Sequence, residues 1–415
     1  MFDCRNRSAA PRFLTFSVLL FAAGLLSICL LSATTLADKP ASDDASEAPS
    51  MEAVPKPEPV PMPEADKIER AMDRGIQFLL DDQNENGSWG TPERTKNLNI
   101  YAPVPGAHHA FRTAVTALCL SSLIEMESDR ADIQRAIDRG EAWMMEHLPE
   151  LRRATPAALY NVWGHGYAIQ ALVRMRERHA DEPDKQERIT ELIRLQYDYL
   201  DRYETVDGGW GYYDFDVGAK TPAGSTTSFV SAAVLVAFDE ARDIGVSPPE
   251  KLTQRAIDSI LRQQKPDFSY LYGEYLKYRP MRGINRPAGS LGRSQACNLA
   301  LRLWGDERVT DQVLKNWLNR LVARNGWLSI GRKRPIPHES WFQVAGYFYY
   351  FGHYYAALCI EQLDEDDQHD FQAHLATILL KLQEKDGSWW DFPLYNYHQQ
   401  YGTAFALMSL KRCHP

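Results

Sequence analysis

The sequence predicts an all-α protein, an (α/α)6 toroid of about twelve helices in six repeats of roughly 60 residues. Two short motifs recur with this period, and each repeat pairs an amphipathic segment with one that is apolar on nearly all sides. An amphipathic outer layer around a buried inner layer would close into a ring. An open solenoid is the alternative, although its end repeats usually carry a polar outer face.

The N-terminal region is expected to lie outside this fold. Residues 1–37 combine several arginines with an apolar run over 13–32, which predicts a signal peptide or, if it is not cleaved, a membrane anchor. Residues 38–64 are rich in proline and acidic residues, so they are predicted to form a disordered linker. The toroid domain is then residues 65–415, either exported (periplasmic or secreted) or tethered to a membrane through the N-terminal segment.

The first motif marks the outer helices. Residues 68–75 (Ile-Glu-Arg-Ala-Met-Asp-Arg-Gly) recur at 133–140 (Ile-Gln-Arg-Ala-Ile-Asp-Arg-Gly), and residues 254–258 are a shorter copy. Apolar residues at helical spacing predict outer helices that begin near residues 66, 131, 184, 248, 311 and 367. Residues 247–250, Ser-Pro-Pro-Glu, predict a capping box at the fourth of these starts.

The second motif lies between the two helices of a repeat. Residues 83–89 and 383–389 both read Gln-x-x-x-Gly-Ser-Trp, and residues 204–210 are a near copy. Degenerate copies occur at 264–270 and at 326–327. The inner helices that follow are expected to begin near residues 110, 163, 225, 291, 339 and 399.

Composition narrows the range of functions. The chain carries 46 Lys and Arg against 55 Asp and Glu, a net charge of −9, so it has no basic surplus for binding nucleic acid. It contains no phosphate-binding loop, dinucleotide motif, zinc-protease motif or serine-hydrolase motif, and no cofactor is expected. Four cysteines, Cys119, Cys297, Cys359 and Cys413, lie in apolar helical segments and are expected to be buried thiols, although an oxidising compartment would permit one disulfide.

The repeats resemble those of squalene and oxidosqualene cyclases and of protein prenyltransferase β-subunits, in which Gln-x-x-x-Gly-x-Trp recurs at this period. Residues 208–216 are similar to a Gly-Gly-Trp-Gly-x-Phe-Asp-x-Asp segment of bacterial squalene–hopene cyclases, and residues 386–390 and 401–403 are similar to their last repeat. The likeness covers residues 66–412. It implies that the motif side chains are structural: Gln83, Trp89, Trp210, Gln383 and Trp389.

The chain departs from the cyclases where they carry their catalytic acid. Cyclases protonate the substrate with Asp-x-Asp-Asp at the start of an inner helix, whereas residues 223–228 here contain no acid. The chain has room for one toroid rather than the two of a cyclase, and two extra residues lie within 396–401. The resemblance therefore implies an apolar isoprenoid-like ligand in a central cavity, but leaves catalysis open.

The prenyltransferase resemblance raises the question of a metal. Those proteins bind Zn²⁺ through Asp, Cys and His on two inner helices. Cys297 and His353 match the Cys and the His, but Gln295 stands in the Asp position, and an amide is a poor ligand for Zn²⁺. No metal site is expected, and Cys297 with His353 is only a weak alternative.

Polar and aromatic residues gather at the starts of the predicted inner helices. These starts converge at one mouth of a toroid, where backbone N–H groups also favour anions. The paired carboxylates and nearby histidines are the candidate catalytic residues: Asp214, Asp216, His109, His165 and His398. The candidate lining of a ligand cavity is Arg112, Tyr167, Arg293, His338, Trp341, His353 and Tyr401.

Three functions agree with these patterns. The first is binding or transformation of an apolar, isoprenoid-like small molecule or lipid. The second is a binding or scaffold protein without catalysis. The third is a carbohydrate-active (α/α)6 enzyme, which would need two carboxylates roughly 5–10 Å apart or a Tyr/His/Arg cleft.

Overall fold

Helices and the turns between them make up the described part of the chain. The computed structural model describes residues 54–95, 106–214, 221–223, 226–334 and 343–414, all within the unit Met51–Pro415. These residues contain thirteen α-helices and no strand longer than an isolated bridge. Four short 3-10 helices also occur: η1 (Leu148–Glu150), η2 (Glu274–Leu276), η3 (Gly283–Asn285) and η4 (Ala288–Ser290). The predicted all-α class is confirmed.

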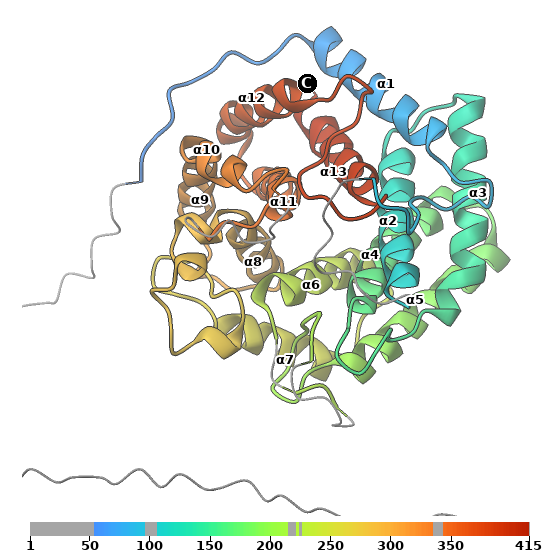
Figure 1. Cartoon of the computed structure of the whole chain (residues 1–415), viewed down its shortest axis with the longest axis horizontal. Helices are drawn as coiled ribbons and strands as arrows, with labels where there is room; N and C mark the ends of the chain where they lie inside the picture. The colour runs from blue at the N-terminus through green and yellow to red at the C-terminus, as the bar shows by residue number, and fades with distance from the viewer. Residues whose placement is uncertain (1–53, 96–105, 215–220, 224–225, 335–342, 415) are drawn as a thin grey trace, which may run out of the picture. The chain divides into compact units, whose positions relative to one another are not determined.

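Six helices form an outer layer (Figure 1). They are α1 (Ala65–Asp81), α3 (Ala131–His147), α5 (Pro183–Tyr203), α7 (Glu250–Leu261), α9 (Asp311–Ala323) and α12 (Glu365–Leu382). A short additional helix, α10 (Asn325–Ile330), follows α9. The outer helices bury one face each; in α1 the buried residues include Ile68, Ile76 and Leu79, at the predicted helical spacing.

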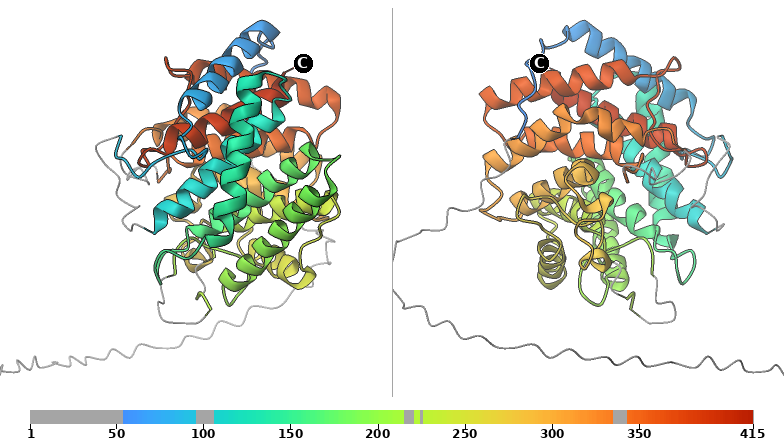
Figure 2. Two further views of the ribbon diagram at one scale, coloured as in Figure 1. Left: turned by 90° about the vertical axis from the view of Figure 1, so that its right-hand side faces the viewer. Right: turned by 60° about the vertical axis from the view of Figure 1, so that its left-hand side comes forward.

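Six inner helices alternate with the outer ones along the chain. They are α2 (Ala107–Glu125), α4 (Asn161–Arg178), α6 (Ser228–Asp243), α8 (Leu291–Leu303), α11 (Phe348–Ile360) and α13 (His398–Cys413). Each packs against the next, and α13 packs against α2, so the ring is closed. Side views show α1 lying along α13, which brings the first and last helices together (Figure 2). The predicted toroid is confirmed, and every residue of α11 is buried, as expected of an inner helix.

The Gln-x-x-x-Gly-x-Trp motif joins three helices at each copy. Trp89 is fully buried; its indole N–H donates to Leu79 O at 2.8 Å, and Thr116 Oγ1 accepts from its backbone N–H at 3.0 Å. Gln83 donates to Gly87 O and, in the next outer helix, to Ala136 O, both at 2.9 Å. Trp210 and Trp389 make the equivalent indole bonds to Leu200 and Leu379. These contacts give the motif a structural role.

The last copy of the motif closes the ring. Gln383 donates to Ala71 O of α1 at 2.8 Å, so the bond that elsewhere joins consecutive repeats here joins the sixth to the first. Gly387 has φ +89, and a Cβ there would lie 2.4 Å from Arg74 O. Gly75 makes room for Trp389, because its Cβ would lie 2.8 Å from the indole. The two sequence motifs therefore recur together because they pack against each other.

Several predicted details are wrong. Residues 326–327 are not a motif copy, since Trp327 lies on α10 and is 43% exposed. The copy at 254–258 is one turn out of register: Arg255, like Arg74 and Arg139, presents its carbonyl to the motif glycine of the preceding repeat. No side-chain capping bond forms at α7, which begins at Glu250.

The largest error in a helix start is at α11, expected near residue 339 but beginning at Phe348. Residues 335–342 lie outside the described part. Before the helix, the backbone at Gly346 passes close to Gly331, where a Cβ would lie 2.4 Å from the Gly331 carbonyl oxygen. Backbone that lies so close to Gly331 has no room for a helical turn at that point.

Residues 1–37 and most of the expected linker also lie outside the described part, so the predicted signal or anchor is not described. Among the residues that are described, no helix combines the length and apolar character needed to cross a membrane.

Candidate functional site

The loops that precede the inner helices meet at one end of the ring, here called the aromatic end. Backbone bridges join Thr91 to Asn396, Ala158 to Tyr213 and Thr227 to Gly273. Consecutive repeats therefore contact one another on this side, including the first and the last. The inner helices begin here and end at the opposite side of the ring.

Aromatic side chains form a continuous series around the aromatic end. Phe111 of α2 lies 4.9 Å from Tyr160, measured between ring centroids, and Phe229 of α6 lies 4.8 Å from Phe348 of α11. Phe229 also lies 5.3 Å from Tyr272. Five aromatic residues of this end are only half-buried: Trp163, Tyr212, Tyr213, Tyr347 and Tyr401.

An aromatic layer crosses the axis of the ring below these residues. Trp163 of α4 lies 6.1 Å from Phe351 of α11, and Tyr167 of α4 lies 5.9 Å from Phe405 of α13. Phe351 and Phe405 are 6.4 Å apart. Because α4 packs between α2 and α6, these contacts join helices on opposite sides of the ring. The middle of the ring is thus filled by side chains rather than open.

Tyrosine hydroxyls supply polar groups at the aromatic end. Tyr272 and Tyr347 hydroxyls lie 2.9 Å apart, and Tyr212 bonds to the same Tyr272 hydroxyl. Arg293 lies beneath them, fully buried, and donates to the carbonyls of Tyr270, Gly289 and Ile284. Burial lowers the pKa of Arg293 to about 10. Its donors go to the protein's own backbone, so Arg293 supports the loop.

The predicted catalytic carboxylate Asp214 is buried in a loop. Arg153 donates to its Oδ2 at 2.9 Å, and Ala223 N–H donates to its Oδ1 at 3.3 Å. Asp216 lies outside the described residues. The contacts of Asp214 are those of a carboxylate that holds two loops together.

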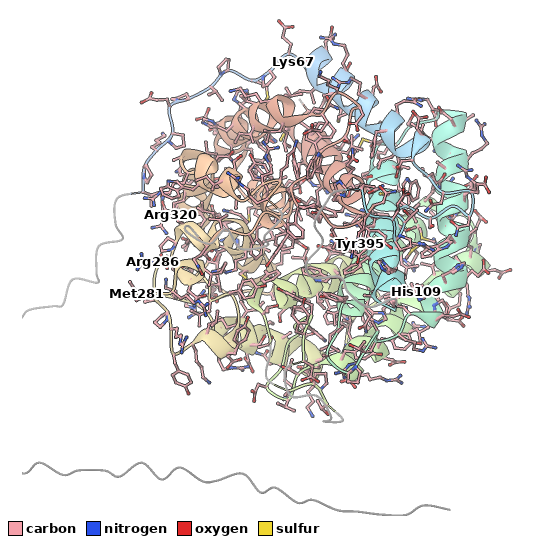
Figure 3. All side chains as sticks on the ribbon, in the orientation of Figure 1. Lys67, His109, Met281, Arg286, Arg320 and Tyr395 are labelled. Atoms are coloured by element: carbon pink, nitrogen blue, oxygen red, sulfur yellow. The ribbon has the colours of Figure 1, made fainter. Side chains whose placement is uncertain are left out.

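The structure does not bring the three candidate histidines together. His109, which is labelled in Figure 3, lies on α2. Its ring packs edge-on against Trp143 of outer helix α3. His165 bonds to Gln196 of α5 at 2.8 Å, and burial lowers its pKa to about 4. His398 bonds to Tyr395 O in the loop that precedes its own helix. His109 and His165 face the outer layer, so they do not converge with Asp214 on the axis.

Some of the candidate lining residues lie at the aromatic end, and two lie outside the described part of the chain. Tyr167 and Tyr401 belong to the aromatic end, and Arg112 lies beside the Tyr397 hydroxyl. Tyr401 donates to Asp391, whose other oxygen accepts from Tyr350 N–H at 3.0 Å. Burial raises the pKa of Asp391 to about 6. His338 and Trp341 lie outside the described residues.

His353, one member of the alternative metal pair, has its ring nitrogens engaged within the protein. His353 is buried with both ring nitrogens in hydrogen bonds, to Tyr349 O and to Asn325. Within the described part of the chain, no three His, Cys, Asp or Glu side chains lie close enough to hold a metal ion. All four cysteines of the domain are buried and free, and burial raises the pKa of Cys297 to about 12.

The opposite end of the ring, here called the charged end, was not predicted. A cavity of about 910 Å³ lies where five of the six inner helices end. Its lining includes Glu125 of α2, Arg174 of α4, Glu240 of α6 and Arg412 of α13. Glu361, the residue that ends α11, lines it as well. The sequence signal was a charged residue at the end of five of the six apolar segments.

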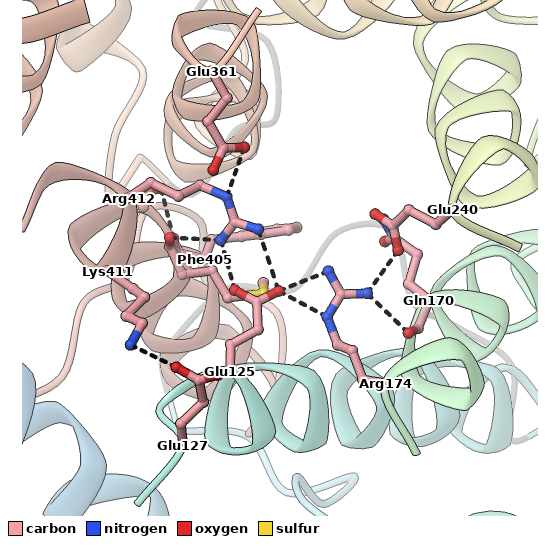
Figure 4. Close-up of polar contacts among 11 residues, drawn as sticks. Glu125, Glu127, Gln170, Arg174, Glu240, Glu361, Phe405, Lys411 and Arg412 are labelled. Carbon is pink, nitrogen blue, oxygen red and sulfur yellow. Dashed lines mark hydrogen bonds and ion pairs between the residues drawn. The ribbon is translucent and has the colours of Figure 1, made fainter. Parts of the chain in front are cut away.

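These five residues form one chain of ion pairs (Figure 4). Arg412 donates to Glu361 at 3.1 Å and to Glu125 at 2.6 Å. Arg174 donates to Glu125 at 2.7 Å and to Glu240 at 2.6 Å. Burial alone would raise the pKa of Glu125, but the two guanidinium groups outweigh it and lower that pKa.

Together these features define a closed α/α ring whose axis is blocked by aromatic side chains. The family model of the squalene-hopene cyclase C-terminal domain matches residues 44–276, which is more than half of the chain. The chain belongs to this family. A search of curated proteins gave no match.

Solved structures share the fold at low identity. The type II terpene cyclase MstE from Scytonema is 15% identical, covers 85% of this chain and 99% of its own, and has a TM-score of 0.47. The GH76A α-1,6-mannanase from Salegentibacter sp. HEL1_6 is 8% identical, covers 84% of this chain and 98% of its own, and has a TM-score of 0.50. At 8% identity the likeness to the mannanase shows the fold alone.

Proposed function

We propose that the domain binds an apolar, isoprenoid-like molecule at its aromatic end. The observation that carries the proposal is the half-buried Trp163, which lies at the centre of the aromatic layer with a stacking contact of 5.6 Å to Tyr167. Large aromatic rings that are not fully covered favour an apolar partner, because burying them removes apolar surface from water. Membership of the cyclase family supports the same class of ligand.

The ligand would lie against the aromatic layer rather than pass through the ring. The layer joins α4 to α11 and α13 across the axis, which leaves no path along it between these helices. The linked hydroxyls of Tyr212, Tyr272 and Tyr347 offer a polar contact at the edge of the same surface. A molecule with an apolar chain and one hydroxyl group would satisfy both features.

Proton-initiated cyclisation is not part of this proposal. Protonating an isolated alkene needs a strong acid that is not neutralised by a partner. Asp214 is paired with Arg153, and Asp391 has a pKa raised to about 6 by burial, which makes it a weaker acid than an ordinary aspartic acid. Incubation with squalene should therefore give no polycyclic product, and a cyclic product would contradict this part of the proposal.

Calorimetric titration of the full chain with farnesol tests the binding. Trp163→Ala should weaken farnesol binding at least tenfold, because about 1.4 kcal/mol of apolar contact corresponds to a factor of ten. Trp327→Ala is the matched control, since Trp327 lies on α10 and is 43% exposed. Equal affinities for the wild type and for Trp163→Ala, or no binding by the wild type, would overturn the proposal.

A further inference from the structure

The ion pairs of the charged end follow the order of the inner helices. Around the ring, the contributors are α11, α13, α2, α4 and α6, which are consecutive neighbours. Their charges alternate in that order: Glu361, Arg412, Glu125, Arg174 and Glu240. These five residues are called the alternating chain below.

The alternating chain is built by the repeat itself. Three of its members stand nine residues after the hydroxyl side chain that accepts from the motif tryptophan N–H. The pairs are Thr116 with Glu125, Ser231 with Glu240, and Thr403 with Arg412. Equivalent positions in equivalent helices lie at the same height in the ring, so these three charges lie at one level. Arg174 and Glu361 join that level through their ion pairs with them.

The level is incomplete at α8. This helix lies between α6 and α11, and no described residue of it lines the cavity. The α8 residue that stands nine positions after Ser290, whose hydroxyl accepts from the Tyr270 N–H, is the apolar Leu299. Arg302 of the last turn of α8 pairs with Asp311 of α9 instead. The two ends of the alternating chain, Glu240 and Glu361, are therefore both carboxylates and flank the one inner helix that contributes no charge.

Electrostatics at this gap favour a cation. The alternating chain has three carboxylates and two guanidinium groups, and the whole lining has seven carboxylates against four cationic side chains. The partial negative charges of five helix C-termini add to this surplus. Glu361 is the most exposed member, with 44% of its side chain accessible, whereas Arg174 and Glu125 are 10% and 13% accessible. The gap is thus the accessible part of the level.

We propose that the cavity binds an organic cation whose ammonium or guanidinium group lies between Glu240 and Glu361. Such a group would complete a six-membered level of alternating charge, one contribution from each inner-helix position. A guanidinium or ammonium suits the site better than a metal ion, because no three ligating side chains converge in the described residues. The volume of about 910 Å³ lies in the range of small-molecule sites.

The test is calorimetric titration of the full chain with agmatine, which carries both a guanidinium and a primary amine, and with glutarate as an anion of similar length. Agmatine should bind to the wild type and glutarate should not. Glu361→Gln should weaken agmatine binding at least tenfold. Its exposed side chain makes one ion pair, to Arg412, and a thermal melt of the variant checks that the fold is kept.

Glu177→Gln is the matched control, because Glu177 lines the same cavity but stands outside the alternating chain. It should leave the agmatine affinity within about twofold of the wild type. The inference is overturned if agmatine does not bind, if glutarate binds as tightly, or if the two glutamine variants lose affinity equally. The farnesol experiment addresses the other end of the ring, so either proposal can fail alone.

Discussion

Asp391 and Asp82 at the aromatic end and Glu125 at the charged end are buried carboxyl groups in opposite electrostatic states. At the aromatic end, burial raises the pKa of Asp391 and of Asp82 to about 6, and the side chains that donate hydrogen bonds to them are neutral: the Tyr401 hydroxyl and the Gln400 amide. At the charged end, Arg174 and Arg412 overcome the burial of Glu125 and lower its pKa. The fold therefore disfavours charge on Asp391 and Asp82 and stabilises it on Glu125. At Glu361, the outermost member of the ion-pair chain, burial outweighs Arg412 and raises the pKa.

The difference follows from what the inner helices carry at each end. Tyrosine, tryptophan and phenylalanine stand at their beginnings, so Asp391 and Asp82 have lost water without gaining a cationic hydrogen-bond partner. Asp214, which pairs with Arg153, is the exception. Glutamate and arginine stand at their ends, where each charge has an opposite neighbour within 3.1 Å. The aromatic layer separates the two environments.

The largest expected effect concerns the closure of the ring at the aromatic end. Trp389→Ala should lower the free energy of unfolding by about 3–5 kcal/mol, the usual cost of removing a large buried aromatic side chain. Trp389 is fully buried, and it packs against Gly75 of the first repeat. Urea denaturation measures the change. Trp327→Ala is the control and should cost under about 1 kcal/mol; similar losses in the two variants would refute a role in closure.

The closed ring of repeats was predictable because the repeated motifs are visible in the sequence. The spacing of the Trp89 and Trp389 motifs gave the period, and a residue such as Trp210, buried between helices, has to recur wherever the same packing recurs. The starts of α3, α8 and α9 agree with the predicted residues. The start of α11 was not predicted correctly, because it depends on the close contact between Gly346 and Gly331.

The site was predicted less well, because spacing does not reveal which way a side chain points. His108 and His109 are neighbours in sequence, yet adjacent residues on an α-helix point about 100° apart. His108 contacts Tyr397 at the aromatic end, and His109 contacts Trp143 of the outer layer. The charged end was not predicted for another reason. A single charge at the end of an apolar helix forms an ion pair only when the ring places an oppositely charged helix end beside it.

The second prediction concerns the ion pairs of Glu125 at the charged end. Glu125→Gln should lower the free energy of unfolding at pH 7 by about 3 kcal/mol, because it removes the carboxylate shared by two buried guanidinium groups. The folded pKa of Glu125 lies below its ordinary value of 4.5, so its stabilisation is present above pH 4.5 and is lost as the pH falls through the folded pKa. The variant should therefore lose less stability on acidification than the wild type does.

Glu127→Gln is the control for this change. Glu127 pairs with Lys411 at 3.2 Å, but its side chain is 78% exposed, so the pair is screened by water. The expected loss is under about 1 kcal/mol. Urea denaturation at pH 7 and pH 4 separates the two variants, and equal losses at pH 7 would contradict a special role for the buried carboxylate.

The smallest expected effect has the opposite sign and lies at the aromatic end. Asp82 directly follows the last residue of α1, where the helix dipole disfavours a negative charge, and Gln400 donates to its Oδ2 at 2.6 Å. Because its pKa rises from 3.8 to about 6 on folding, the folded state binds the extra proton between these values. Stability should fall as the pH rises from 4 to 6.

Asp82→Asn keeps an acceptor for Gln400 and removes the charge, so it should stabilise the domain at pH 7 by about 1–2 kcal/mol after allowance for partial exposure. It should also flatten this part of the pH profile. Asp81→Asn, one residue earlier and exposed, should leave the profile unchanged. Thermal melts of the three proteins at pH 4, 5, 6 and 7 make the comparison, and a wild-type profile retained in Asp82→Asn would show that Asp82 is not the titrating group.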